Sequence, residues 1–264
     1  MPLTYKAVFI SDVHLGTAAC RAGDLLQFLN SIETEKLFLV GDIIDLERMK
    51  LRPSFPDLHR QIVKRFIQLA ASGTEVIYIP GNHDHEFRDM VGRDVCGIPV
   101  RMNADYVTAD GRRLLIAHGD ELDGILRNGT GIEAVGAAAY AVLMQVDVMV
   151  NQLRERLGHD HLSISRHVKL RLSSANEFIA RFEEEAARYA AERGYDGIVC
   201  GHIHRPGVRM FDEVLYCNDG DWVEHRTALA ETSDGRLELL RWEHDRVAVD
   251  VHRHGSDTNA PLAA

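Results

Sequence analysis

The chain has 264 residues, of which 45% are hydrophobic, and a formal net charge of −10 at pH 7. This length fits one large domain, or a domain with an insert, that buries a sizeable core. The acidic balance argues against a nucleic-acid partner, because proteins that bind nucleic acids usually present a basic face. The four cysteines form no C-x-x-C pair, which argues against a disulfide framework and favours a reducing, cytoplasmic location.

The first half of the chain alternates between predicted strands and predicted helices. Short apolar, β-branched segments predict strands, and apolar residues at every third or fourth position predict helices. The predicted strands are 7–10, 37–40 and 76–79, and the predicted helices are 22–32 and 58–71. This alternation indicates an α/β sheet with helices packed on it.

The later strands follow a different pattern. Turn residues separate short apolar segments, which predicts antiparallel hairpins. These segments are 106–108, 113–117, 197–200, 208–211, 214–217, 227–231 and 236–242. We therefore expect a second sheet stacked on the first, with helices outside both.

Polar side chains directly follow five of the predicted strands. The segments are S-D-V-H at 11–14, G-D-I-I-D at 41–45, G-N-H-D at 81–84, H-G-D at 118–120 and G-H-I-H at 201–204. Ligands of open α/β sheets bind beyond the carboxyl ends of the strands, so these five ends direct Asp, Asn and His side chains to one place. One such motif is ordinary loop chemistry, whereas five in series predict a site.

The side chains at these strand ends have the chemistry of metal ligands. The donors are Asp12, His14, Asp42, Asn82, His118, His202 and His204. Oxygen and nitrogen donors without sulfur suit Mn²⁺, Mg²⁺, Fe or Zn²⁺. Seven donors are too many for one ion and fit two ions that share a bridging carboxylate. Such a pair lowers the pKa of a bridging water, supplies hydroxide near neutral pH, and leaves positive charge for an anionic substrate.

The spacing of the motifs predicts where an insert lies. The separation between His118 and His202 is roughly twice that between earlier neighbouring motifs. We predict a core of residues 1–122 and 195–252, a helical insert over 123–194 that covers the site as a lid, and a disordered tail over 253–264.

The predicted insert contains an apolar segment and a basic segment. Residues 135–153 are apolar on more than one helix face, which fits either a helix buried among others or a lid that meets acyl chains or the bilayer interface. Arg166, Lys169 and Arg171 fit either a solvated helix face or contacts with substrate phosphates.

The ordered series D-x-H, G-D-x-x-D, G-N-H-D, H-G-D and G-H-x-H resembles the calcineurin-like metallophosphoesterases. The resemblance implies a two-sheet αββα sandwich and two metal ions bridged by Asp42. It implies that His83 donates to a phosphoryl oxygen or protonates the leaving oxygen, and that Asp45 and Asp84 orient imidazoles or waters. The ligand sets it implies are Asp12, His14 and His204 for one ion, and Asn82, His118 and His202 for the other.

Within that family the chain resembles the UDP-2,3-diacylglucosamine pyrophosphohydrolase group of lipid A biosynthesis. The segments that carry this resemblance are "FISDVHLG", "LVGDIIDL", a helical insert after "HGDELDG", "CGHIHRP" and "NDGDWVE". One difference is that the best-known members of the group have Arg at the position of His83. The resemblance implies a hydrolase, with Mn²⁺ as the first metal to expect, that acts on a lipid-linked or nucleotide-sugar phosphate in the cytoplasm or peripherally at the inner membrane surface.

Two other functions remain open at this point. One is a phosphodiesterase or phosphatase for cyclic nucleotides or small phosphoesters. The other is a binding module that keeps the fold without metals, against which the complete set of seven donors argues. The sequence predicts no oligomeric state.

Overall fold

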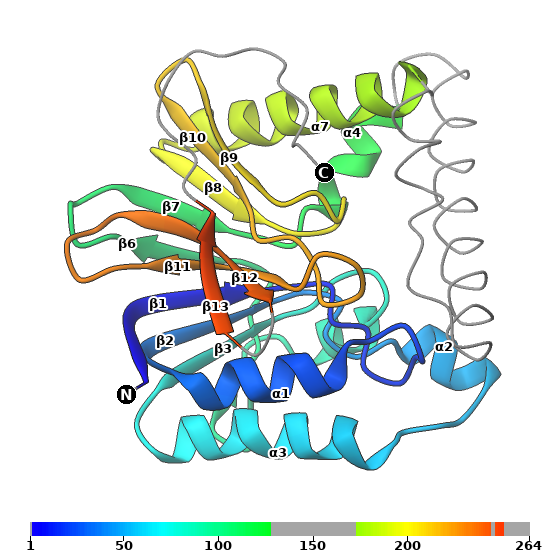
Figure 1. Ribbon diagram of the computed structural model, residues 1–264. Helices are drawn as coiled ribbons and strands as arrows, with labels where there is room; N and C mark the ends of the chain where they lie inside the picture. Colours follow the sequence, from blue (N-terminus) through cyan, green and yellow to red (C-terminus); the bar gives the residue numbers. More distant parts are fainter. Residues whose placement is uncertain (1, 128–172, 244–245, 251–264) are drawn as a thin grey trace.

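The computed structural model describes residues 2–127, 173–243 and 246–250 (Figure 1). The predicted apolar helix 135–153, the basic residues Arg166, Lys169 and Arg171, and the predicted tail 253–264 lie outside the described residues. Among the described residues, no helix is long and apolar enough to cross a bilayer.

The first sheet has six strands in the order β13-β12-β11-β1-β2-β3. Strands β1, β2 and β3 are parallel, β11 pairs with β1 in antiparallel fashion, and β12 and β13 follow β11 as successive antiparallel neighbours. Phe9 pairs with Phe38, which pairs with Ile77, so the three parallel strands end at about the same level. The strands are β1 (Leu3–Ile10), β2 (Ile32–Val40), β3 (Glu75–Ile79), β11 (Thr227–Glu231), β12 (Leu237–Glu243) and β13 (Arg246–Asp250).

The second sheet has five strands in the order β6-β7-β8-β10-β9. Its three central strands, β7, β8 and β10, are parallel, and an antiparallel strand flanks them on each side. The strands are β6 (Ala104–Val107), β7 (Arg113–Ile116), β8 (Gly197–Cys200), β9 (Gly207–Phe211) and β10 (Val214–Asn218). A separate hairpin joins β4 (Asp94–Val95) to β5 (Ile98–Pro99).

Helices cover the outer face of each sheet, as Figure 1 shows. Helices α1 (Ala22–Ser31) and α3 (Asp57–Ala71) pack on the first sheet, and α7 (Ser173–Ala191) packs on the second. The resulting four layers confirm the predicted αββα sandwich. The predicted limits 123–194 of the insert include α7, whose Phe182 and Ala186 are fully buried against the second sheet.

Short helices lie in the loops that follow the strands. They are α2 (Leu46–Leu51), the 3₁₀ helices His85–Met90 and Asp120–Leu122, and α4 (Asp123–Arg127). The loops after β2, β3 and β7, which carry Asp42, Asn82 and His118, therefore lead into helical turns.

The interior between the two sheets is apolar and aromatic. Side chains alternate along β1, so Val8 and Ile10 face the helices while Phe9 faces the second sheet. The Phe9 and Phe38 rings stack with centroids 4.9 Å apart, and Tyr106 of the second sheet meets both rings edge-on. This packing holds the two sheets face to face.

One buried polar contact joins the sheets within this interior. The Tyr106 hydroxyl donates a hydrogen bond to the carboxylate of Glu231, which is fully buried. The other Glu231 oxygen accepts from the Ala109 N–H at 2.6 Å. A buried carboxylate needs such donors, because an unpartnered charge in the interior is costly.

We expect the Tyr106→Phe change to lower the free energy of unfolding by about 1–3 kcal/mol, because it removes a donor from a buried carboxylate. Urea denaturation measures this loss. Tyr195→Phe is the matched control, since the Tyr195 hydroxyl bonds to Asp105 at the surface and its loss should cost less than about 0.5 kcal/mol. Equal effects of the two changes would contradict the prediction.

Candidate metal centre

The loops after the parallel strands of both sheets meet at one edge of the sandwich. Within the first sheet, the Asp12 N–H donates to the Gly41 carbonyl at 3.1 Å. Within the second sheet, the Gly201 N–H donates to the His118 carbonyl at 3.1 Å. The His202 N–H joins the two sheets by donating to Asp12 Oδ2 at 2.9 Å. The predicted convergence of strand ends is therefore present in the structure.

Asp12, His14 and His204 form a first group of candidate ligands. Their donor atoms lie close enough together to hold one ion. His204 Nε2 lies 3.1 Å from Asp12 Oδ1, and His14 Nε2 lies 3.9 Å from the same oxygen. The His14 and His204 rings stack with centroids 5.4 Å apart.

Asp42 and His118 form a second group that shares Asp12 with the first. His118 Nε2 lies 3.5 Å from Asp42 Oδ2 and 3.3 Å from Asn82 Oδ1. The other ring nitrogen, Nδ1, lies 2.9 Å from the Val40 carbonyl, to which it can donate only if it carries the proton. That bond leaves the Nε2 lone pair free for a metal.

Asp42, a member of the second group, also faces His14 of the first group. Its Oδ2 atom is 3.5 Å from His118 Nε2 and 3.9 Å from His14 Nε2, while its Oδ1 accepts from the His83 N–H at 2.7 Å. One carboxylate thus faces a candidate ligand of each ion.

His202 lies beside the second group. Its ring is 5.2 Å from that of His118 between centroids, and its Nε2 pairs with Asp123 Oδ1 at 3.1 Å. Asp123 begins α4, and the sequence analysis placed it in the insert without assigning it a role.

The backbone of the candidate ligands is strained. Among the described residues, eight non-glycine residues have positive φ, and five of them are candidate ligands. Positive φ costs non-glycine residues energy and clusters at functional sites. The five are Asp12 (50°), His14 (52°), Asp42 (52°), His202 (67°) and His204 (50°).

Gly81 allows two of the loops to approach closely. A Cβ atom at this position would lie 2.7 Å from the Asp42 backbone nitrogen and 2.7 Å from His118 Nε2. Any side chain there would displace the candidate ligands, so this close approach requires glycine.

Asp45 joins a candidate ligand to the candidate catalytic histidine. It caps α2 by accepting from the Arg48 N–H at 2.8 Å, and its two oxygens lie 3.2 Å from His14 Nδ1 and 3.4 Å from His83 Nδ1. Asp45 therefore faces the imidazoles of both His14 and His83.

The acidic neighbours of His83 favour its protonated form in the metal-free chain. Burial alone would lower its pKa, but the hydrogen bond with Asp45 and the nearby charges of Asp42, Asp45 and Glu47 raise the pKa of His83 to about 9. About a third of the side chain remains exposed, so a bound substrate could reach it.

Asp84 is fully buried and holds loops rather than imidazoles. The family resemblance implied that Asp84 orients imidazoles or waters, whereas its donors in the structure are four backbone N–H groups and one hydroxyl. A carboxylate at a tight turn takes such donors because the loop amides have no strand partners. The donors are Gly81 N at 2.6 Å, Asp42 N at 3.3 Å, Ile43 N at 2.8 Å, Ile44 N at 3.3 Å and Tyr78 Oη at 2.5 Å.

The turn after β10 is a sixth strand end that the sequence analysis did not count. Asn218, Asp219 and Asp221 are all fully buried there. The Ser11 hydroxyl lies 2.5 Å from Asp219 Oδ1 and 2.6 Å from Asp12 Oδ2. The segment N-D-G-D after an apolar strand is the same signal as at the other five ends, without a histidine.

The charges of the cluster fit divalent cations. Burial opposes ionisation of Asp12, but the nearby charge of His204 holds the pKa of Asp12 below its ordinary value. Burial alone would lower the pKa of His118, and the charge of Asp42 raises it well above its ordinary value instead. Asp12 Oδ1 is buried without a hydrogen-bond partner. A carboxylate oxygen in that state, among imidazoles, suits a metal ion.

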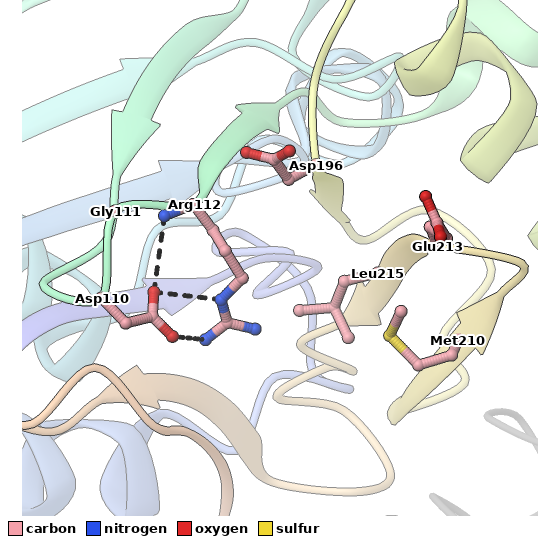
Figure 2. A pocket seen from close by; sticks show the side chains of 7 residues that line it. All are labelled: Asp110, Gly111, Arg112, Asp196, Met210, Glu213 and Leu215. Atoms are coloured by element: carbon pink, nitrogen blue, oxygen red, sulfur yellow. Dashed lines mark hydrogen bonds and ion pairs between the residues drawn. The ribbon is translucent and has the colours of Figure 1, made fainter.

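A pocket of about 380 Å³ lies at the opposite ends of the strands (Figure 2). Strands β7 and β8 begin near it, whereas the candidate ligands follow the ends of these strands. Arg112 is held there by Asp110 at 2.7 Å and by the Gly235 carbonyl at 2.9 Å. The lining residues, Asp110, Gly111, Arg112, Asp196, Met210, Glu213 and Leu215, include none of the candidate ligands.

Comparisons with known proteins show which family the chain matches and which proteins it is similar to. A family model described as calcineurin-like phosphoesterase matches residues 5–206, a range that contains all seven candidate ligands. A UDP-2,3-diacylglucosamine hydrolase of Chromohalobacter salexigens is 26% identical over 255 residues, covering 90% of this chain and 93% of that protein. One of Xanthomonas campestris pv. campestris is 25% identical and covers 86% and 96%. The solved structure of a Vps29 double mutant of Entamoeba histolytica is 11% identical, covers 92% and 96%, and has a TM-score of 0.49.

We expect the affinity for divalent metal to rise with pH, because metal binding needs neutral imidazoles. Burial lowers the pKa of His204, but the charge of Asp12 and its hydrogen bond raise it to about 9. The metal-free chain therefore holds this proton below pH 9, and each displaced proton should change the affinity by up to roughly tenfold per pH unit. Titration calorimetry with Mn²⁺ in two buffers of different ionisation enthalpy measures the released protons. A pH-independent affinity without proton release would contradict the prediction.

Proposed function

The chain belongs to the calcineurin-like phosphoesterase family, and from that premise we propose that it is a two-metal hydrolase of a lipid-linked or nucleotide-sugar phosphate. The observation that supports the metal pair most strongly is the position of Asp42, whose Oδ2 lies within 3.9 Å of both His14 Nε2 and His118 Nε2. A carboxylate in that position can bridge two ions.

We assign the ligands as follows. Asp12, His14 and His204 would hold one ion, and Asn82, His118 and His202 would hold the other. Mn²⁺ is the first candidate, and these donors also accept Mg²⁺, Fe or Zn²⁺. Bound there, the ions would neutralise phosphoryl charge and lower the pKa of a water molecule.

His83 would act on the substrate directly. Its imidazolium would donate to a phosphoryl oxygen or protonate the leaving oxygen, and in the metal-free chain its acidic neighbours raise the pKa of His83 to about 9. Asp45 holds the ring from the other side, 3.4 Å from Nδ1. The proposed metal ions and the His83 imidazolium would neutralise the acidic groups of the site, so the site would attract a substrate oxyanion.

We further propose that the substrate carries acyl chains and a diphosphate. The support is that relatives similar to this chain over most of their length have the name UDP-2,3-diacylglucosamine hydrolase. In this proposal the insert 123–194 covers the site, residues 135–153 meet the acyl chains, and the protein works in the cytoplasm or at the inner membrane surface. Arg166, Lys169 and Arg171 would contact the phosphates.

The role of His83 can be separated from metal binding by mutation. We expect His83→Ala to retain both ions while kcat falls by roughly 10²–10⁴-fold, the usual contribution of a positioned acid or oxyanion donor. Metal content and steady-state kinetics are the two measurements. His85→Ala is the matched control, because that neighbouring histidine is exposed, and it should keep wild-type kcat. Loss of an ion from the His83 variant would make His83 a ligand.

The substrate class can be tested by comparing three compounds with the wild-type enzyme and Mn²⁺. We expect a diacylated UDP-glucosamine to exceed its deacylated form and a small chromogenic phosphodiester by at least about tenfold in kcat/KM, because burying acyl chains adds binding free energy. Replacing Arg166, Lys169 and Arg171 together by alanine should raise KM for both UDP-glucosamine compounds, because both carry the diphosphate, and should leave KM for the small phosphodiester unchanged. Preference for the small phosphodiester would favour a phosphodiesterase of small substrates.

A further inference from the structure

The turn after β10 carries a carboxylate that the proposed function leaves without a role. Asp221 is fully buried, and its Oδ1 accepts from the backbone N–H groups of Val223 at 2.9 Å, Glu224 at 2.5 Å and His225 at 3.1 Å. Its Oδ2 lies 2.5 Å from His225 Nδ1. Four donors therefore fix the position of this carboxylate.

The same carboxylate faces the back of a candidate metal ligand. Asp221 Oδ2 lies 3.9 Å from His204 Nδ1, while His204 Nε2 lies 3.1 Å from Asp12 Oδ1. The two ring nitrogens of His204 thus face two different carboxylates, one on the metal side and one on the far side. His204 Nδ1 is buried and has no hydrogen-bond partner at this distance.

We propose that Asp221 is a positioning residue that accepts the Nδ1–H of His204 and so presents the Nε2 lone pair to the metal. A neutral imidazole has one N–H, so an acceptor at Nδ1 fixes the tautomer that can ligate through Nε2. A carboxylate in this place also makes the imidazole a stronger ligand. This inference rests on the proposed metal site.

The distance of 3.9 Å is longer than a hydrogen bond, so the pair must close by roughly 1 Å when the ring takes its place on the ion. His204 is the mobile partner, because four donors already hold Asp221. The contact with His225 keeps the Asp221 carboxylate in place while the His204 ring moves.

A purely structural role for Asp221 is the competing explanation, since its Oδ1 caps the turn 222–225. Asp221→Asn separates the two, because the amide oxygen can still accept from the three backbone N–H groups. The amide nitrogen that replaces Oδ2 cannot accept from His204.

The experiment measures Mn²⁺ affinity of the full chain by titration calorimetry and unfolding of the metal-free chain by urea. We expect Asp221→Asn to weaken one of two sites by about 10–100-fold, the usual cost of losing such a partner, with the other site unchanged. The metal-free unfolding midpoint should fall no further than in His225→Gln, which loses the same contact at Oδ2. His225→Gln should weaken the same site by less, because the backbone donors still hold Asp221. The Co²⁺ absorption spectrum of that site should shift in the Asp221→Asn variant.

Asp94→Asn is the matched control, since Asp94 also caps a turn, by accepting from the Gly97 N–H at 2.7 Å at the surface. It should leave both affinities unchanged. The inference would be overturned if Asp221→Asn left the Mn²⁺ affinity unchanged. It would also be overturned if the variant weakened both sites equally and lowered the metal-free midpoint, and in either case the proposed function would stand. A wild-type chain that binds no divalent ion would overturn both.

Discussion

The arrangement of the candidate site depends on the buried carboxylate of Asp12 and its partners from both sheets. Asp12 is fully buried, follows the end of β1 in the first sheet, and accepts from the His202 N–H after β8 in the second sheet. Its other oxygen faces His204. A buried charge is costly unless cations and donors surround it, so the position of Asp12 requires positive partners at the meeting of the two sheets. Imidazolium groups meet that need in the metal-free chain, and divalent ions would meet it more strongly.

The strain at the candidate ligands follows from the same requirement. Donors on loops from two sheets can point at one small volume only if the chain turns sharply directly after each strand. Left-handed backbone at Asp12, His14, Asp42, His202 and His204 provides those turns, at a cost of about 1–2 kcal/mol for each residue. In the metal-free chain, packing of the interior around Phe9 and Phe38 must offset this unfavourable backbone free energy. Bound ions would offset it further.

The sequence predicts the two-sheet sandwich and the strand ends because both depend on local patterns. It does not predict the strand order: segments 227–231 and 236–242, expected in the second sheet, join the first, and β7, β8 and β10 are parallel rather than hairpins. Apolar β-branched runs identify the strands, and D-x-H, G-N-H-D and G-H-x-H mark where they end. The functions of Asp84, Asp123 and Asp221 could not be predicted in the same way, because each depends on partners distant in sequence or on backbone N–H groups. Asp84 is an example: its donors include amides about forty residues earlier in the chain. The N-D-G-D segment after β10 was visible as a pattern, but only the fold places Asp221 behind His204.

The hydrogen bonds of Asp84 also affect how the protein can be redesigned. Asp84 fastens the loop after β3 to the loop after β2 through the Asp42, Ile43 and Ile44 amides, so the two loops form one rigid unit. The chain between them, which contains α2 and α3, therefore does not itself set the distance between Asp42 and Asn82. Residues on the exposed face of α3 can be exchanged, or the loop before α3 lengthened, with little effect on the spacing of these donors. This makes the α2–α3 connection a suitable place for grafted peptides or fluorescent labels.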